Sequence, residues 1–206
     1  MKPILLGTLA MAAIVVASNI LVQFPIGHWL TWGAFSYPFA FLVSDLMNRF
    51  YGAVAARRVV YGGLITGLIC SFIGTQIIGD FGPLVTLRVA FGSAIAFLVG
   101  QLLDITLFDR LRRAAWWRAP FLSTLLGSTA DTLIFFTIAF SATLAWIEPA
   151  NDITWAAEQV SLLGIGPFVP LWVSLAVADW GVKLLIDLLA LLPFRLALAK
   201  YASRIA

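Results

Sequence analysis

Long apolar stretches separated by short polar connectors make up most of the chain. Stretches at roughly 4–24, 33–51, 59–79, 84–108, 119–147 and 168–194 each approach the ~20 residues that a helix needs to cross a bilayer. The connector at 148–167 is long and acidic, and we expect it to be an ordinary loop. The pattern predicts an all-α polytopic membrane protein with six transmembrane helices, in which residues 1–206 form a single transmembrane domain.

Composition supports the membrane class and removes several others. The chain is 62% hydrophobic and 11% charged, with a mean hydropathy of +0.99, which no ordinary soluble domain matches. One cysteine, Cys70, and one histidine, His28, exclude a disulfide framework and a multi-cysteine metal site, and make a histidine-based site improbable. No nucleotide-binding loop occurs. We therefore expect no enzyme activity, metal, cofactor or nucleic-acid partner. The first stretch is too long for a typical signal peptide and is predicted to be an anchor.

Charge in the connectors predicts the orientation. Positive residues cluster at the N-terminus, after the second stretch, between the fourth and fifth stretches, and after the sixth. The alternate connectors contain no lysine or arginine, and several hold acidic residues. Because positively charged connectors stay on the cytoplasmic side, both termini are predicted to be cytoplasmic. The basic residues in or next to these positively charged segments are Lys2, Arg49, Arg57, Arg58, Arg110, Arg112, Arg113, Arg118, Arg195, Lys200 and Arg204.

The last apolar stretch contains three charged residues on one helical face. Asp179, Lys183 and Asp187 are spaced four residues apart, and Lys183 falls near the middle of the membrane. A lysine at that depth costs roughly 2.5–3.5 kcal/mol on insertion scales, so it should face protein or water. Asp179 four residues before Lys183 is the favourable order for a helical ion pair. A functional site and a structural ion pair are equally compatible with this pattern.

Other apolar stretches carry polar residues that lipid would also disfavour. Because exposure to lipid is costly for all of them, we expect them to converge on a wet or ligand-filled hollow shared by Asp131 and Lys183. Carboxylates accept hydrogen bonds, amides do both, and lysine and arginine donate, which suits a planar heterocycle with an N–H edge and a carbonyl. An inorganic cation fits a lysine-containing site less well. The residues are Ser18, Asn19, Gln23, Asp45, Asn48, Arg49, Arg88, Ser93, Gln101, Asp104, Thr124, Ser128 and Asp131.

Aromatic and small residues add two weaker signals. Phe35, Tyr37, Phe39, Phe135 and Trp180 lie near the polar positions and can stack on a planar ring, although each is more typical of packing. Small residues repeat every fourth position in 63–67 and in 92–100, as Gly-x-x-x-Gly and Gly-x-x-x-Ala-x-x-x-Gly. This spacing predicts close helix packing rather than chemistry.

Four ordered motifs resemble one family of bacterial membrane proteins. They are PFAFLVSDLMNRFYG (38–52), LRVAFGSAIAFLVGQLLDITLF (87–108), STLLGSTADTLIFF (123–136) and DWGVKLLIDLLALLP (179–193). Together they resemble the VUT family, also called the queuosine precursor transporter family. Gly127 and Ser128 depart from that pattern, because a glutamine is expected shortly before the aspartate.

The resemblance implies a function, a fold and a set of site residues. The function is import of the 7-deazaguanines preQ0 and preQ1, used in tRNA modification, across the bacterial inner membrane. The fold would be similar to the substrate-binding subunits of energy-coupling-factor transporters, and a homodimer is compatible with it. Asp131 would meet the N–H edge of the deazaguanine, and Gln101 or Lys183 its carbonyl. The substrate-binding residues carried over by position are Asn19, Asp45, Arg88, Gln101, Asp131 and Lys183.

Four functional hypotheses remain open from the sequence. The first is a stand-alone secondary or facilitated transporter, with Asp45, Asp104 and Asp179 as candidate proton carriers. The second is a binding subunit that a separate ATPase complex energises. The third, an intramembrane aspartate-based enzyme, is weak because no serine–histidine or cysteine–histidine pair is available. The fourth, a purely structural membrane protein, is disfavoured by the number of buried polar residues.

Overall fold

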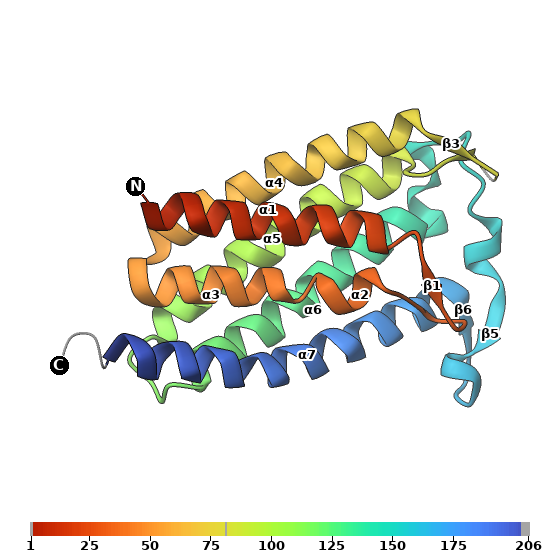
Figure 1. Cartoon of the computed structure of the whole chain (residues 1–206). Coiled ribbons are helices and arrows are strands. Elements are labelled where there is room, and N and C mark those ends of the chain that lie inside the picture. Colours follow the sequence, from red (N-terminus) through yellow and green to blue (C-terminus); the bar gives the residue numbers. More distant parts are fainter. Residues whose placement is uncertain (1, 81, 203–206) are drawn as a thin grey trace.

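Long apolar helices form the main body of the structure. The computed structural model describes residues 2–80 and 82–202. Within them, four helices are long and apolar enough to cross a membrane: α1 (Lys2–Leu21), α4 (Ala53–Gln76), α5 (Leu87–Leu111) and α6 (Arg118–Phe140). They run side by side along one direction, with their ends at the same two sides of the bundle (Figure 1). At 1.5 Å per residue, the 24 residues of α4 extend ~36 Å, enough for the hydrocarbon core of a bilayer.

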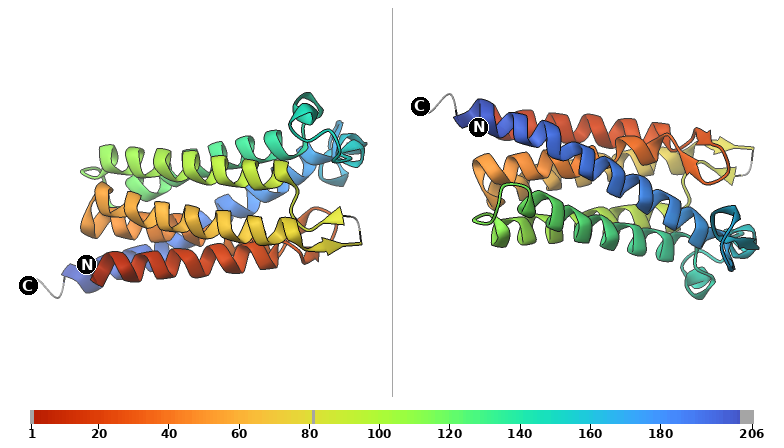
Figure 2. Two further views of the ribbon diagram at one scale, coloured as in Figure 1. Left: turned by 90° about the horizontal axis from the view of Figure 1, so that it is seen from above. Right: turned by 90° about the horizontal axis from the view of Figure 1, so that it is seen from below.

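The second and sixth predicted spans differ from these four. The second is divided into α2 (Gly33–Ser36) and α3 (Phe39–Tyr51), because Pro38 has no N–H to donate and interrupts the helical ladder. The sixth, α7 (Leu171–Ala202), is 32 residues long but carries three charged residues in its middle. Both segments extend along the other four helices in all three views (Figures 1 and 2). The crossing of the membrane by all six stays a prediction.

The two ends of the bundle have different connectors. The start of α1, the end of α7 and the short α3–α4 and α5–α6 connections lie at one end, which carries the basic connectors (Figure 2). Three short antiparallel hairpins lie at the opposite end: β1 (Pro25–Ile26) with β2 (Leu30–Thr31), β3 (Ile78–Gly79) with β4 (Gly82–Pro83), and β5 (Gln159–Ser161) with β6 (Phe168–Pro170). This separation supports the orientation predicted from charge. Arg204 lies outside the described residues.

Two predictions were wrong at the hairpin end: where the fifth helix ends, and what kind of connector follows it. The stretch 119–147 is not one helix: α6 ends at Phe140, Ser141 is extended, and a 3-10 helix follows at Ala142–Ile147. The connector 148–167 is not an ordinary loop, because it contains two short 3-10 helices, Thr154–Ala157 and Leu162–Gly164, as well as β5. Trp155 in this connector packs edge-on against Phe140, with 5.5 Å between ring centroids.

At the other end, α7 continues beyond the predicted boundary at 194 and passes through Pro193. Phe194 explains why the chain stays packed there. Its side chain is 1% exposed and meets Phe108 edge-on, with 6.1 Å between ring centroids. Burial of two phenylalanine rings in one contact offsets the loss of the hydrogen bond that Pro193 cannot make.

Small residues let the helices approach closely, as the sequence predicted. A Cβ atom added to Gly63 of α4 would lie 2.5 Å from Met11 Cγ of α1. The backbones of α5 and α6 also approach closely, since a Cβ on Gly127 would lie 2.9 Å from the carbonyl oxygen of Gly100. Gly127 therefore has a packing reason to depart from the family pattern. The same contact brings Gly100 against Asp131, which places α5 beside the polar interior.

We predict that Gly127→Ala destabilises the bundle by about 1–3 kcal/mol, because the added methyl group overpacks a backbone contact. Gly181→Ala is the matched control, since no atom lies within 4 Å of the Cβ position in α7. The control should be neutral or up to ~1 kcal/mol more stable, through helix propensity alone. Thermal unfolding of both purified variants in detergent measures the difference. Equal midpoints for the two variants would contradict the close approach of α5 and α6.

Candidate functional site

A buried lysine forms the centre of the polar interior. The Nζ atom of Lys183 in α7 lies 2.8 Å from Asp131 Oδ2, 2.6 Å from Asp179 Oδ2 and 2.9 Å from Thr132 Oγ1. These contacts use all three protons of the ammonium group. Lys183 is 4% exposed and Asp131 is 3% exposed. The predicted ion pair between Asp179 and Lys183 is thus confirmed, and a second pair joins α7 to α6.

Tyr37 completes the surroundings of Asp131. Its hydroxyl donates to Asp131 Oδ1 at 2.7 Å, and the Lys183 Nζ atom lies 5.1 Å from the centroid of its ring. Tyr37 occupies the break between α2 and α3, directly before Pro38. The sequence marked Tyr37 only as a ring that can stack, and its role as a hydrogen-bond donor was missed. The signal that could have identified it is Pro38 in the middle of an apolar stretch. A proline there predicts a break in the helix, and the residue at the break can turn its side chain toward a neighbouring helix.

The expected hollow between Asp131 and Lys183 is absent, because the two side chains are in direct contact. A cavity of about 50 Å³ lies beside them and is lined in part by Asn19, Tyr37, Ser93 and Phe97. Pockets for small organic ligands are typically about 300–1,000 Å³, so this cavity is too small for a bicyclic heterocycle. The structure is therefore closed at this point, with Asp131 and Lys183 in contact. In this closed structure the side chain of Asn19 donates to the carbonyl oxygen of Val15 in its own helix.

Gln101 is buried without a hydrogen-bond partner. Its side chain is 0% exposed, and neither its amide nitrogen nor its oxygen has a partner among the described residues. A buried polar group left unpaired costs about 1–3 kcal/mol. Gln101 follows Gly100, whose backbone packs against Asp131, so residue 101 lies at about the level of the Lys183 centre along the bundle. Both of its polar atoms therefore have hydrogen-bonding capacity that the closed structure does not use.

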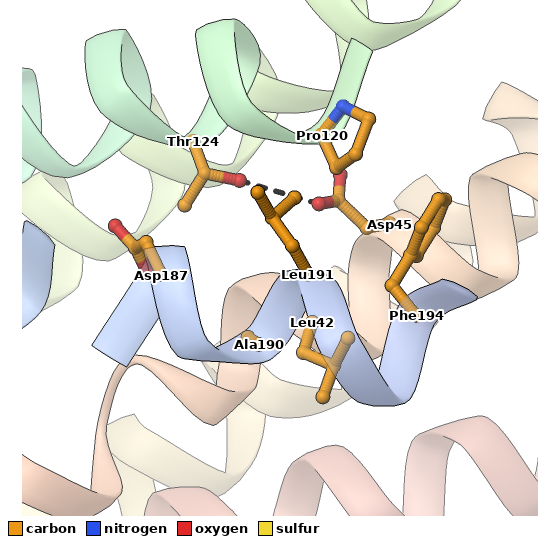
Figure 3. A pocket seen from close by; sticks show the side chains of 8 residues that line it. All are labelled: Leu42, Asp45, Pro120, Thr124, Asp187, Ala190, Leu191 and Phe194. Carbon is orange, nitrogen blue, oxygen red and sulfur yellow. Dashed lines mark hydrogen bonds between the residues drawn. The ribbon is translucent and has the colours of Figure 1, made fainter. Parts of the chain in front are cut away.

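Asp45 and Asp104 form a second polar cluster with Thr124. The hydroxyl oxygen of Thr124 lies 3.2 Å from Asp45 Oδ2 and 3.1 Å from Asp104 Oδ1. Asp45 and Thr124 also line a cavity of about 10 Å³ together with Asp187, which lies one turn beyond Lys183 (Figure 3). The structure therefore does not bring Asp45 to Lys183, where the sequence placed it, but groups it with Asp104.

Arg88 lies apart from both clusters, at the hairpin end of α5. It is fully buried, and its guanidinium donates to the carbonyl oxygens of Ile138 at 3.0 Å and Ser141 at 2.7 Å. These carbonyls belong to the end of α6, which leaves such groups without helical partners. The backbone N–H of Arg88 donates to Glu148 Oε2 at 3.1 Å. Thirteen residues separate Arg88 from Gln101, or ~20 Å along the helix, so the structure does not unite them.

A helical membrane protein with a polar, closed interior is the class that this fold and centre define. Comparison with known families identifies it further. The sequence model of the family described as "Putative vitamin uptake transporter" matches residues 31–198. The chain belongs to this family, which confirms the resemblance indicated by its four motifs.

Curated relatives agree with this assignment. Over 194 residues the chain is 37% identical to the "Queuosine precursor transporter" of Escherichia coli (strain K12), covering 87% of this chain and 79% of the relative. It is 37% identical over 154 residues to the "Probable queuosine precursor transporter" of Haemophilus influenzae, covering 62% and 65%. The corresponding Bacillus subtilis (strain 168) protein is 28% identical over 197 residues, covering 84% and 73%. No solved structure gives a significant match.

We predict that Lys183→Met lowers the free energy of unfolding by about 3–5 kcal/mol, because it leaves two buried carboxylates without their cation. Adding Asp131→Asn to this variant should restore part of the loss. Lys2→Met, at the exposed start of α1, is the control and should behave as wild type. Unfolding of the purified proteins in detergent measures all three. A Lys183→Met variant as stable as wild type would show that the ammonium group is not bound as described.

Proposed function

We propose that this protein imports the queuosine precursors preQ0 and preQ1 across the bacterial inner membrane, as a stand-alone secondary or facilitated transporter. The names of the curated relatives support the substrate class. The observation that carries the proposal is the buried array of a carboxylate, an ammonium group and an unpartnered amide on α5, α6 and α7. The same proposal includes six membrane crossings with both termini in the cytoplasm, and a homodimer stays compatible with it.

The chemistry of the array matches a deazaguanine. Asp131 has two oxygens that now accept from Tyr37 and Lys183, and in the bound form they accept from the N–H edge of the base. Lys183 and Gln101 can then donate to the carbonyl of the base. Asn19 and the rings of Tyr37 and Phe97 line the small cavity beside the ion pair, and the base can stack on these rings once the ion pair has separated and the cavity has widened.

Closure by the ion pair gives the substrate-free protein a defined resting state. An unpaired ammonium or carboxylate inside the bundle would be costly, so Asp131 and Lys183 hold each other until a ligand offers equivalent hydrogen bonds. A ligand without both a donor edge and a carbonyl cannot replace both partners. Selectivity for a guanine-like edge therefore follows from the cost of leaving one charge unpaired. In this proposal Arg88 has a structural role at the end of α6, and Asp45 belongs to the other cluster.

We predict that Asp131→Asn raises the Kd for preQ0 and preQ1 roughly 10- to 100-fold, because it removes charge-assisted hydrogen bonds worth about 1.5–3 kcal/mol. Asp152→Asn, in the exposed hairpin-end connector, is the matched control and should bind as wild type. Equilibrium binding to purified protein and uptake into liposomes that contain only this protein measure the effect. Unchanged binding in Asp131→Asn would remove Asp131 from the site. Binding without uptake in the liposomes would favour a subunit that needs a separate energising complex.

A further inference from the structure

The positions of Asp45, Asp104 and Thr124 require a proton that the ordinary charge states of these residues do not supply. One hydroxyl oxygen lies within 3.2 Å of two carboxyl oxygens from two other helices. A threonine hydroxyl carries one hydrogen and can donate to only one of them. If both aspartates were ionised, the second oxygen would face Thr124 without a hydrogen between them. Both contacts become hydrogen bonds when one carboxyl group is protonated and donates to Thr124 Oγ1, while Thr124 donates to the other.

Burial supports the same conclusion. Asp45 is 3% exposed and Asp104 is 0% exposed, and each has a second carboxyl oxygen without a partner among the described residues. Two adjacent buried carboxylates without a cation are strongly unfavourable, and such groups remain neutral instead. Asp187 is 8% exposed, faces the same water-sized cavity of about 10 Å³, and also has one oxygen without a partner (Figure 3). That volume is about what one water molecule needs.

The carboxyl groups of this cluster come from three of the four helices packed around it. Helix α3 contributes Asp45, α5 contributes Asp104 and α7 contributes Asp187, whereas α6 contributes hydroxyl groups, among them those of Thr124, Ser123 and Ser128. Lys183, one turn away on α7, has its three protons bound to Asp131, Asp179 and Thr132. Among the described residues, no lysine or arginine forms an ion pair with the three carboxyl groups of the cluster.

The cluster also has a defined position relative to the proposed substrate centre. Asp104 follows Gln101 by three residues on α5, and Asp187 follows Lys183 by four on α7. Both helices run from the hairpin end toward the end with the basic connectors (Figure 1). The cluster therefore lies between the substrate centre and the predicted cytoplasmic side. A substrate released to that side has to pass the packed contact between Asp45, Thr124 and Asp104.

We propose that Asp45, Thr124 and Asp104 form a proton-binding site whose proton holds the cytoplasmic half of the bundle closed, and that transport requires release of this proton to the cytoplasm. The inference rests on the proposed import function. Release breaks one carboxyl O–H bond and transfers the proton to water on the cytoplasmic side. It leaves two carboxylates that repel each other and draw in water, which separates α3 from α5 and α6. Closing forms the O–H bond again with a proton from water.

Infrared spectroscopy of the purified wild-type protein, with labelled aspartate, tests the site itself. A band from a protonated aspartate should be present at neutral pH. Asp45→Asn and Asp104→Asn should each remove the same band, because the proton is shared. Thr124→Val, which keeps the shape but loses the hydroxyl, should shift this band. Thr106→Val is the matched control, since its hydroxyl donates to the carbonyl of Leu102 in its own helix. A wild-type protein without such a band, or a band unchanged in both aspartate variants, would overturn the proposal.

Exchange of labelled preQ1 across liposomes tests the role of the proton in transport. In wild type the rate should increase up to about tenfold per unit of internal pH, because release to the inside becomes easier. In Asp104→Asn the rate should be lower and independent of internal pH, while equilibrium binding of preQ1 stays at the wild-type value. Equal pH dependence in both proteins would contradict the gating role. Failure of wild type to bind preQ1 would instead contradict the proposed function, and the infrared band would still test the proton site.

Discussion

An ammonium group buried inside the helix bundle is the constraint on which the structure depends. Apolar surroundings cannot solvate the charge of Lys183, and its hydrogen-bond partners among the described residues are carboxylates and a hydroxyl on α6 and α7. Satisfying that charge determines where α7 packs and how it is rotated. Asp131 in turn needs a second donor, which Tyr37 supplies from the break between α2 and α3. One buried charge thereby connects three segments that are far apart in the sequence.

Much of this arrangement could be predicted from the sequence, but only for features that depend on the residue spacing within a single helix or connector. Asp179 and Lys183 could be paired from their spacing, and the glycines at 63 and 100 indicated close packing, because both features follow from helical periodicity. The apolar stretches located the helices, but several of their ends were misplaced, as at Phe140 and Ala202. The separation of basic from acidic connectors at the two ends was also predictable, because connector charge is a property of local sequence.

Contacts between helices were less predictable. Nothing in the order of residues distinguishes Asp45, which meets Asp104 through Thr124, from Asp131, which meets Lys183, because all are single aspartates in apolar helices. Rotation and depth of each helix decide between the two clusters, and both depend on packing across the bundle. Arg88 was likewise predicted to bind the ligand, but its guanidinium instead donates to carbonyl oxygens at the end of α6, which lack helical partners.

The polar interior is divided into levels along the bundle. Arg88 binds the end of α6 at the hairpin side, the Lys183 centre lies in the middle, and the Asp45–Asp104 cluster lies toward the basic end. The two inner levels are linked by a single turn of α7, from Lys183 to Asp187. A ligand that separates Asp131 from Lys183 thus acts on the same helix that contacts the carboxyl cluster, which provides a physical route from substrate binding to opening.

The central claim is that the substrate takes the place of the Asp131–Lys183 contact. A structure of the protein with bound preQ1 tests it most directly. The account predicts that the base lies between Asp131 and Lys183 and that their side chains separate well beyond the 2.8 Å of the closed form. A bound base elsewhere in the protein, with this ion pair still intact, would contradict the account.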